Sequence, residues 1–193
     1  MHKFDPKNLK KLDNPTRRKY MPPYKTLERF GLKLKGEETF LDVGCGIGYF
    51  TIPAAKILSK GKSIGIDISE EMLNYAKERA KDIDNIEFKQ CFEYEFPIES
   101  NSINYVMLSN VLHEIEDKKK FLKEVKRTLK NNGQVFIIEW KKINTNYGPP
   151  FDHRISKEEV IEIFKTMGFE LIEDLEVSKH HYGLKFTLSN NVI

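Results

Sequence analysis

The feature that most constrains the fold is a glycine-rich turn between an apolar run and a helix-like run. Residues 40–50 read FLDVGCGIGYF, with glycines at alternate positions and one aspartate, Asp42, just before them. Glycines let a backbone turn sharply and let a ligand approach the main chain closely. In open α/β sheets, such turns follow the carboxyl ends of strands, where ligands bind. The stretch therefore predicts a strand–turn–helix unit beside a ligand site, in preference to a plain turn.

Strand-like and helix-like segments alternate along most of the remaining chain, which predicts a parallel sheet with helices on both faces. Ser69 is expected to cap one helix, and Ser156 with Glu159 forms a capping box before another. A short connection around 181–183 predicts an antiparallel hairpin at the sheet edge. Strands are expected at 39–44, 63–67, 85–90, 103–110, 133–140, 170–179 and 183–189, and helices at 24–32, 49–61, 70–82, 117–133 and 160–169.

Length and composition narrow the class of protein. The 193 residues fit one domain, which we expect to span 1–193, with an N-terminal arm or lid at 1–23 and a Rossmann-like core at 24–193. The net charge is +3, from 32 basic and 29 acidic side chains, and the lysines are scattered among glutamates, which disfavours nucleic acid as a partner. We also expect no membrane segment and no export signal.

The cysteines indicate where the protein works. There are two, Cys45 and Cys91, which fits a reduced compartment better than a disulfide framework. Neither shows the spacing of a zinc site, so no metal is expected. The sequence therefore predicts a cytoplasmic protein.

The spacing of the glycines discriminates between ligands. A dinucleotide fingerprint is G-x-G-x-x-G, whereas the glycines here follow G-x-G-x-G, and Tyr49 occupies the position of that fingerprint's last glycine. Asp42 is a poor neighbour for a pyrophosphate and a good one for an ammonium group. Asp67 ends the next strand, where a carboxylate can accept hydrogen bonds from ribose hydroxyls. These residues predict a nucleoside ligand that carries positive charge.

Four stretches then resemble one known family: LDVGCGIGYFT, GIDIS, SINYVMLSNVLHEIED and LKNNGQVFIIEW. They are similar to the class I S-adenosylmethionine-dependent methyltransferases, and more narrowly to the small-molecule type 11 group that includes the ubiquinone and menaquinone enzymes. The likeness covers roughly residues 35–168. It implies a seven-stranded sheet in the order 3-2-1-4-5-7-6, with strand 7 antiparallel, and S-adenosylmethionine as the cofactor.

The resemblance also implies site residues. The family often has an acid after the third strand that binds adenine, but here the stretch is KQCFEYEFP, with Phe92 at that position. Adenine recognition is therefore expected from the backbone near Phe92, with Glu93 as a substitute acceptor. The other implied cofactor contacts are Asp42, Gly44, Cys45, Gly46, Gly48, Asp67, Ile68, Met72, Asn110 and Val111.

Candidates for the chemistry lie beyond the fourth and fifth strands. His113 is a candidate general base because imidazole titrates near neutral pH, the alternative being a packing role. The polar connection after the fifth strand carries Tyr147, His153 and Arg154, candidate substrate contacts in a loop that closes over the site. The alternative for Arg154 is a loop stitched to the next helix. Tyr20 is a further candidate, since aromatic faces attract cations.

The sequence thus predicts a methyltransferase that acts on an unidentified small molecule, as a monomer or homodimer. Two alternatives stay open. One is a protein that keeps the cofactor site without catalysis, and the other is an NAD-dependent oxidoreductase, which the glycine spacing and Asp42 disfavour.

Overall fold

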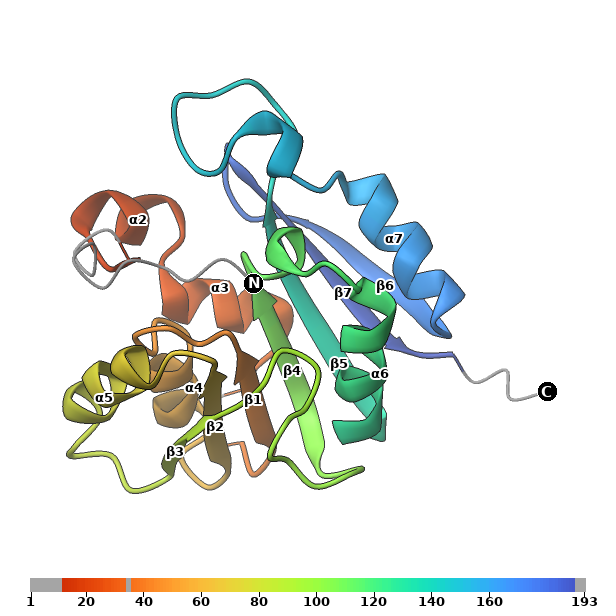
Figure 1. Ribbon diagram of the computed structural model, residues 1–193. Coiled ribbons are helices and arrows are strands. Elements are labelled where there is room, and N and C mark those ends of the chain that lie inside the picture. Colours follow the sequence, from red (N-terminus) through yellow and green to blue (C-terminus); the bar gives the residue numbers. More distant parts are fainter. Residues whose placement is uncertain (1–11, 34–35, 190–193) are drawn as a thin grey trace.

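A computed structural model describes residues 12–33 and 36–189 of the chain. Its centre is a seven-stranded sheet in the order β3-β2-β1-β4-β5-β7-β6 (Figure 1). The order confirms the topology that the family resemblance implied. The strands are β1 (Thr39–Val43), β2 (Lys62–Asp67), β3 (Ile86–Gln90), β4 (Ile103–Ser109), β5 (Leu129–Trp140), β6 (Phe169–Glu176) and β7 (His181–Leu188).

Pairing within the sheet is parallel from β3 to β5 and antiparallel at β7. Strand β7 also pairs antiparallel with β6, which confirms the predicted edge hairpin. The α-helices are α2 (Pro15–Tyr20), α3 (Pro23–Phe30), α4 (Thr51–Ile57), α5 (Glu70–Arg79), α6 (Lys118–Thr128) and α7 (Lys157–Thr166), and the short 3-10 helices are η2 (Leu112–Glu114) and η3 (Phe151–His153).

Two apolar layers cover the sheet. On one face, Phe30 of α3 stacks on Phe136 of β5, with the ring centroids 4.9 Å apart, and α4 packs beside them. On the other face, α6 and α7 contribute Phe121 and Phe164, and the ring of Phe164 stacks on Phe186 of β7. Because both faces of the sheet are covered, the edge where the parallel strands end is the expected place for a ligand in such a fold.

The predicted helix caps are confirmed. The Ser69 side chain accepts the Met72 amide hydrogen at the start of α5. Ser156 and Glu159 form a reciprocal capping box at the start of α7. Gly31 closes α3 in the left-handed conformation, with φ 105°. These local signals therefore mark the start of α5 and α7 and the end of α3.

Several predicted boundaries were wrong; for example, the helix expected at 160–169 ends at Thr166, and Phe169 begins β6. Two others have a clear physical cause. The helix expected at 117–133 ends at Thr128, because buried Leu129 pairs with Ile103 and the chain continues as β5. The hairpin connection lies at 177–180 instead of 181–183. Gly183 belongs to β7, opposite Ile138, where a Cβ atom would approach the Phe30 ring to 3.0 Å. In both cases tertiary packing overrode a local turn signal.

The N-terminal helix α2 and the connection that follows β5 both rise above the carboxyl edge of the sheet, in the upper part of Figure 1. Asn14 caps α2 by accepting the Arg17 amide hydrogen, and Pro15 occupies the first helical turn, where a missing N–H costs little. Met21, which follows α2, is buried in the layer formed by α3 and α4. Within the described residues, no helix is long and apolar enough to cross a lipid bilayer.

Candidate functional site

A cavity of about 170 Å³ opens at the carboxyl edge, above β1, β2 and β4. Its wall comes from the glycine turn, the ends of β2 and β4, and helix α2. Parallel strands that end at one edge bring these distant segments together. The lining residues are Leu12, Arg17, Asp42, Gly44, Cys45, Gly46, Ile47, Tyr49, Phe50, Asp67, Ile68, Ser69, Met72, Ser109, Asn110, Val111 and Glu114.

The glycine turn forms the floor of this cavity. Gly44 has φ 69° and Gly46 has φ 52°, in the left-handed region that side chains disfavour. A Cβ atom on Gly44 would lie 2.7 Å from a methyl group of Val111. The amide hydrogens of Gly44 and Cys45 bond to the Ile66 carbonyl oxygen at 2.8 and 3.0 Å, so the turn is fixed against β2. The floor is thus rigid, and its shape depends on the missing side chains.

Asp42 lies below the turn and is 3% exposed. The Thr51 hydroxyl donates to its Oδ2 at 2.6 Å. Burial raises the pKa of Asp42 to about 7, against the hydrogen bonds from Thr51 that lower it, and the nearby charge of Asp67 raises it further. Asp42 makes no ion pair with any described residue. A cationic group entering the cavity would compensate this carboxylate.

Asp67 ends β2 and joins two segments of the site. Its Oδ2 accepts the Gly46 amide hydrogen at 2.8 Å, and its Oδ1 accepts that of Ser69 at 2.9 Å. Burial raises the pKa of Asp67, while these backbone hydrogen bonds oppose the rise. Each carboxylate oxygen retains a second lone pair for a ligand hydroxyl. Asp67 therefore both holds the glycine turn and offers acceptors to the cavity.

The end of β4 supplies polar atoms that lack partners. The Ser109 hydroxyl and the Asn110 side-chain oxygen are buried, and neither has a hydrogen-bond partner among the residues that the structure describes. Asn110 also has φ 57°, a left-handed conformation that asparagine tolerates better than most residues. Buried polar atoms without partners are costly, and both residues line the cavity. A polar ligand that bonded to them would remove this cost.

Most of the predicted cofactor residues meet in this cavity, and three do not. Gly48 does not line the cavity, and a Cβ atom on it would be 3.1 Å from Ile52. Phe92 is 75% exposed and pairs with Glu95 in an isolated bridge. Neither Phe92 nor Glu93 lines the cavity. An adenine contact at Phe92 and Glu93 stays a prediction.

His113 stands in η2, on the other side of the β4 end. Its Nδ1 lies 2.8 Å from Oε2 of Glu139, a fully buried carboxylate of β5. Burial lowers the pKa of His113, but the hydrogen bond and charge of Glu139 outweigh burial and raise it overall. His113 lines a second, open hollow of about 710 Å³ with His153 and Arg154, and not the cavity beside Asp42. Its Nε2 lies 3.9 Å from Oε1 of Glu114, which does line that cavity.

Arg154 organises the connection between β5 and α7. Its guanidinium donates to the carbonyl oxygens of Pro149, Lys141, Ile143 and Tyr147 and to the Thr145 hydroxyl. The side chain is 3% exposed. These partners all lie in the connection itself, so Arg154 holds that loop together, and none of them belongs to the next helix, α7.

The aromatic candidates cluster at the start of β7. The Tyr20 ring stacks on His181, with the centroids 5.7 Å apart, and Trp140 packs on His181 from the β5 side. Tyr147 is 65% exposed and lies 5.7 Å from His180. His153 is exposed in η3. The structure therefore does not gather the predicted substrate residues around the cavity, and their role stays a prediction.

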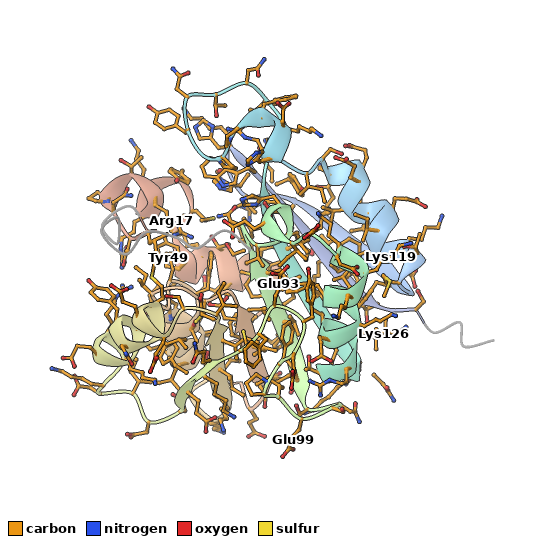
Figure 2. The ribbon with its side chains drawn as sticks, viewed as in Figure 1. Arg17, Tyr49, Glu93, Glu99, Lys119 and Lys126 are labelled. Atoms are coloured by element: carbon orange, nitrogen blue, oxygen red, sulfur yellow. The ribbon has the colours of Figure 1, made fainter. Side chains whose placement is uncertain are left out.

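Sequence reasoning missed a basic residue of the cavity wall, Arg17. Its guanidinium lies 4.0 Å above the centre of the Tyr49 ring, and the two side chains are labelled side by side in Figure 2. Asn14 followed by Pro15 is typical of a helix start, so the helix itself was detectable, but that pattern does not place Arg17 in the cavity. The distance along the chain between Arg17 and the glycine turn hid its position.

A seven-stranded sheet of this order, with a cavity over the glycine turn, defines the Rossmann-like class of ligand-binding domains. Residues 34–183 match a family described as a methyltransferase domain. A solved S-adenosylmethionine-dependent methyltransferase from Aquifex aeolicus is 36% identical, with a TM-score of 0.89 over 95% of this chain and 98% of that one. The chain belongs to the class I S-adenosylmethionine-dependent methyltransferases of the type 11 group.

Other relatives agree with this membership. A putative type 11 methyltransferase from Sulfolobus solfataricus is 27% identical, with a TM-score of 0.72 over 90% of this chain and 96% of that one. A demethylmenaquinone methyltransferase from Staphylococcus aureus is 39% identical over 100 residues. That match covers 51% of this chain and 42% of the relative, so the chain matches less than half of that protein's length.

Proposed function

We propose that the protein uses S-adenosylmethionine to methylate a small molecule. The observation that carries the proposal is the pairing of a poorly compensated carboxylate with unpartnered polar atoms around one cavity. Asp42 suits an ammonium group, and the oxygens of Ser109 and Asn110 lack partners. The amino-acid end of S-adenosylmethionine carries an ammonium and a carboxylate. The residues present therefore fit this cofactor.

The chain's own residues would hold the cofactor by separate contacts. Asp42 would face the ammonium, and Asp67 would accept from the ribose hydroxyls. Ile68 and Met72 supply apolar surface beside Asp67. The cofactor supplies an electrophilic methyl group on a sulfonium. The left-handed glycine turn lets the backbone pass directly under the ligand, since a Cβ on Gly44 would clash with the cavity wall.

His113 would act as a proton acceptor only if the methyl acceptor loses a proton on attack. Glu139 holds Nδ1 of the imidazole at 2.8 Å, which leaves Nε2 as the atom that can take a proton. The raised pKa of His113 makes its neutral imidazole a stronger base. It also means that a larger fraction of His113 is already protonated at neutral pH. Methyl transfer itself depends mainly on holding donor and acceptor close and aligned.

The demethylmenaquinone methyltransferase from Staphylococcus aureus makes a demethylated quinone the first acceptor to test. Because the match covers 42% of that relative, other small molecules remain candidate methyl acceptors. Monomeric or homodimeric assembly and a cytoplasmic location remain predictions from the sequence.

Isothermal titration with S-adenosylhomocysteine, and separately with NAD, tests the cofactor assignment. We expect saturable one-site binding of S-adenosylhomocysteine and none of NAD. Binding of NAD alone would favour the oxidoreductase alternative. A second assay would follow transfer of a labelled methyl group to demethylmenaquinone and to a small-molecule extract. Tight cofactor binding without transfer to any acceptor would favour the alternative of a binding protein.

A further inference from the structure

The wall of the cavity carries more acidic than basic side chains. Asp42 and Asp67 line it, while Arg17 is the only basic side chain among the described residues of its wall. A carboxylate placed near these acids needs a cation, because desolvated like charges repel strongly. The amino-acid end of the proposed cofactor brings such a carboxylate into the cavity. A residue that neutralises it is therefore required, and the wall offers one.

Arg17 has the donors for this task. Its Nη1 donates to the Leu12 carbonyl oxygen at 2.6 Å, and its planar group lies over the Tyr49 ring. It forms no ion pair with a carboxylate of any described residue. A guanidinium carries five N–H donors in a fork that matches a carboxylate. Stacking on Tyr49 fixes the plane of the fork while its remaining donors stay available to a ligand.

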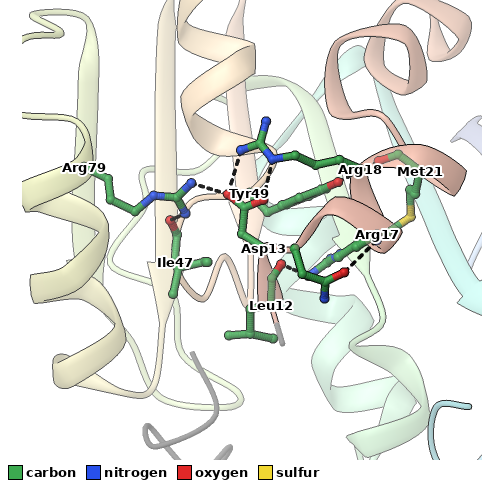
Figure 3. Close-up of polar contacts among 9 residues, drawn as sticks. Leu12, Asp13, Arg17, Arg18, Met21, Ile47, Tyr49 and Arg79 are labelled. Carbon is green, nitrogen blue, oxygen red and sulfur yellow. Dashed lines mark hydrogen bonds and ion pairs between the residues drawn. The ribbon is translucent and has the colours of Figure 1, made fainter. Parts of the chain in front are cut away.

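The position of Arg17 is secured from both ends of α2 (Figure 3). Before the helix, Asp13 forms ion pairs with Arg18 and with Arg79 of α5. Arg79 also donates to the Ile47 carbonyl oxygen of the glycine turn at 2.8 Å. These contacts tie the start of α2 to the floor of the cavity.

The other end of α2 is held through Tyr49. Its hydroxyl donates to the Met21 carbonyl oxygen at 2.8 Å, just after the helix. Tyr49 therefore supports the Arg17 guanidinium with its ring and the end of α2 with its hydroxyl. A group fixed in this way loses little conformational entropy when it binds a ligand.

We propose that Arg17 binds the α-carboxylate of the cofactor and determines specificity for ligands with a complete amino-acid end. The inference deepens the proposed function and rests on it. Asp42 would bind the ammonium group of the cofactor, and Arg17 would bind its carboxylate. A ligand that keeps the ammonium but lacks the carboxylate would place its positive charge near an unsatisfied guanidinium. It should bind weakly for that reason.

Calorimetry with S-adenosylmethionine and its decarboxylated form tests this directly, because the two differ only in the carboxylate. For the wild-type chain we expect S-adenosylmethionine to bind about 10- to 100-fold more tightly, as for a charge-assisted hydrogen bond. Arg17→Gln should reduce this ratio to about 3-fold or less. It should weaken S-adenosylmethionine and strengthen the decarboxylated ligand, since repulsion is removed.

Lys19→Gln is the matched control, because Lys19 is an exposed basic residue of the same helix that does not line the cavity. It should leave the ratio of affinities at the wild-type value. Thermal unfolding of both variants would show whether α2 is retained. An unchanged ratio in Arg17→Gln, or a wild-type chain that binds both ligands equally, overturns the assignment. A wild-type chain that binds neither ligand contradicts the proposed function itself.

Discussion

The two halves of the carboxyl edge differ in what they leave for a ligand. Above β1, β2 and β4, the cavity contains Asp42 without an ion pair and the unpartnered oxygens of Ser109 and Asn110. Above β5 and β7, the Arg154 guanidinium donates hydrogen bonds to oxygens of its own loop, and Nδ1 of His113 lies within hydrogen-bond distance of Glu139. The first half offers a carboxylate without an ion pair to a charged ligand, whereas in the second half Arg154 and His113 already have protein partners beside an open hollow of about 710 Å³. This difference explains why the cofactor can be assigned and the acceptor cannot.

The largest effect is expected from Asp42→Asn, which removes the charge but keeps the shape. Cofactor affinity should fall by about 2 to 3 kcal/mol, because the ammonium loses a charged partner. Stability of the ligand-free protein should not fall, since a buried charge without an ion pair is removed. Calorimetry and thermal unfolding measure the two changes. If cofactor affinity and the stability of the ligand-free protein fell together, Asp42 would be only a structural residue.

The same variant makes the pH dependence testable. In the ligand-free protein the pKa of Asp42 is about 7, and an ammonium group beside it would lower that pKa. Binding is then favoured by the deprotonated form, so affinity should rise as the pH increases through 7 and level off above it. In Asp42→Asn this rise should disappear. A rise of the same size in the variant would assign the titration to another group.

Gly44→Ala tests the floor of the cavity and should have the next largest effect. Its left-handed backbone costs about 1 to 3 kcal/mol for a residue with a side chain, and the new Cβ would meet Val111 at 2.7 Å. Gly46→Ala is the matched control, since it has similar backbone strain but an ordinary 3.9 Å contact with Leu12. Cofactor affinity should fall more in the first variant. Equal losses would mean that backbone strain alone matters.

Arg154→Ala probes the other half of the edge. We expect the free energy of unfolding to fall by about 1 to 2 kcal/mol, because several loop carbonyl oxygens lose their donors. Affinity for S-adenosylhomocysteine should be unchanged, since Arg154 does not line the cavity. Lys142→Ala removes an exposed side chain of the same loop and serves as the control. A marked loss of cofactor affinity in Arg154→Ala would refute the separation of the two halves.

The smallest effect concerns His113. Nuclear magnetic resonance titration of the imidazole should give a pKa above the ordinary histidine value, owing to Glu139. Glu139→Gln should lower this pKa, since it removes the charge that outweighs burial. Cofactor affinity should change little. A pKa that does not move would show that Glu139 does not control the protonation of His113.

The cofactor half was predictable because its signals are local. The glycine turn, Asp42 before it and Asp67 at the next strand end lie in short stretches, and the sheet order brings those stretches to one edge. Helix caps at Ser69 and Ser156 were predictable for the same reason.

The other features depend on packing between distant segments. Arg17 reaches the cavity only because Asp13 binds Arg79 and Tyr49 binds the end of α2. The pairing of His113 with Glu139 joins two strand ends that carry no shared motif. No local pattern of residues could indicate such contacts. The role of Arg154 likewise depends on hydrogen bonds to loop oxygens, which the sequence does not specify.

A structure of the protein bound to S-adenosylhomocysteine tests the central claim most directly. We expect the ribose hydroxyls at Asp67, and the amino-acid end between Asp42 and Arg17 above the glycine turn. Adenine contacts near Phe92 would be read from the same structure. A ligand bound outside this cavity, or with its amino-acid end directed away from Asp42 and Arg17, would contradict the account.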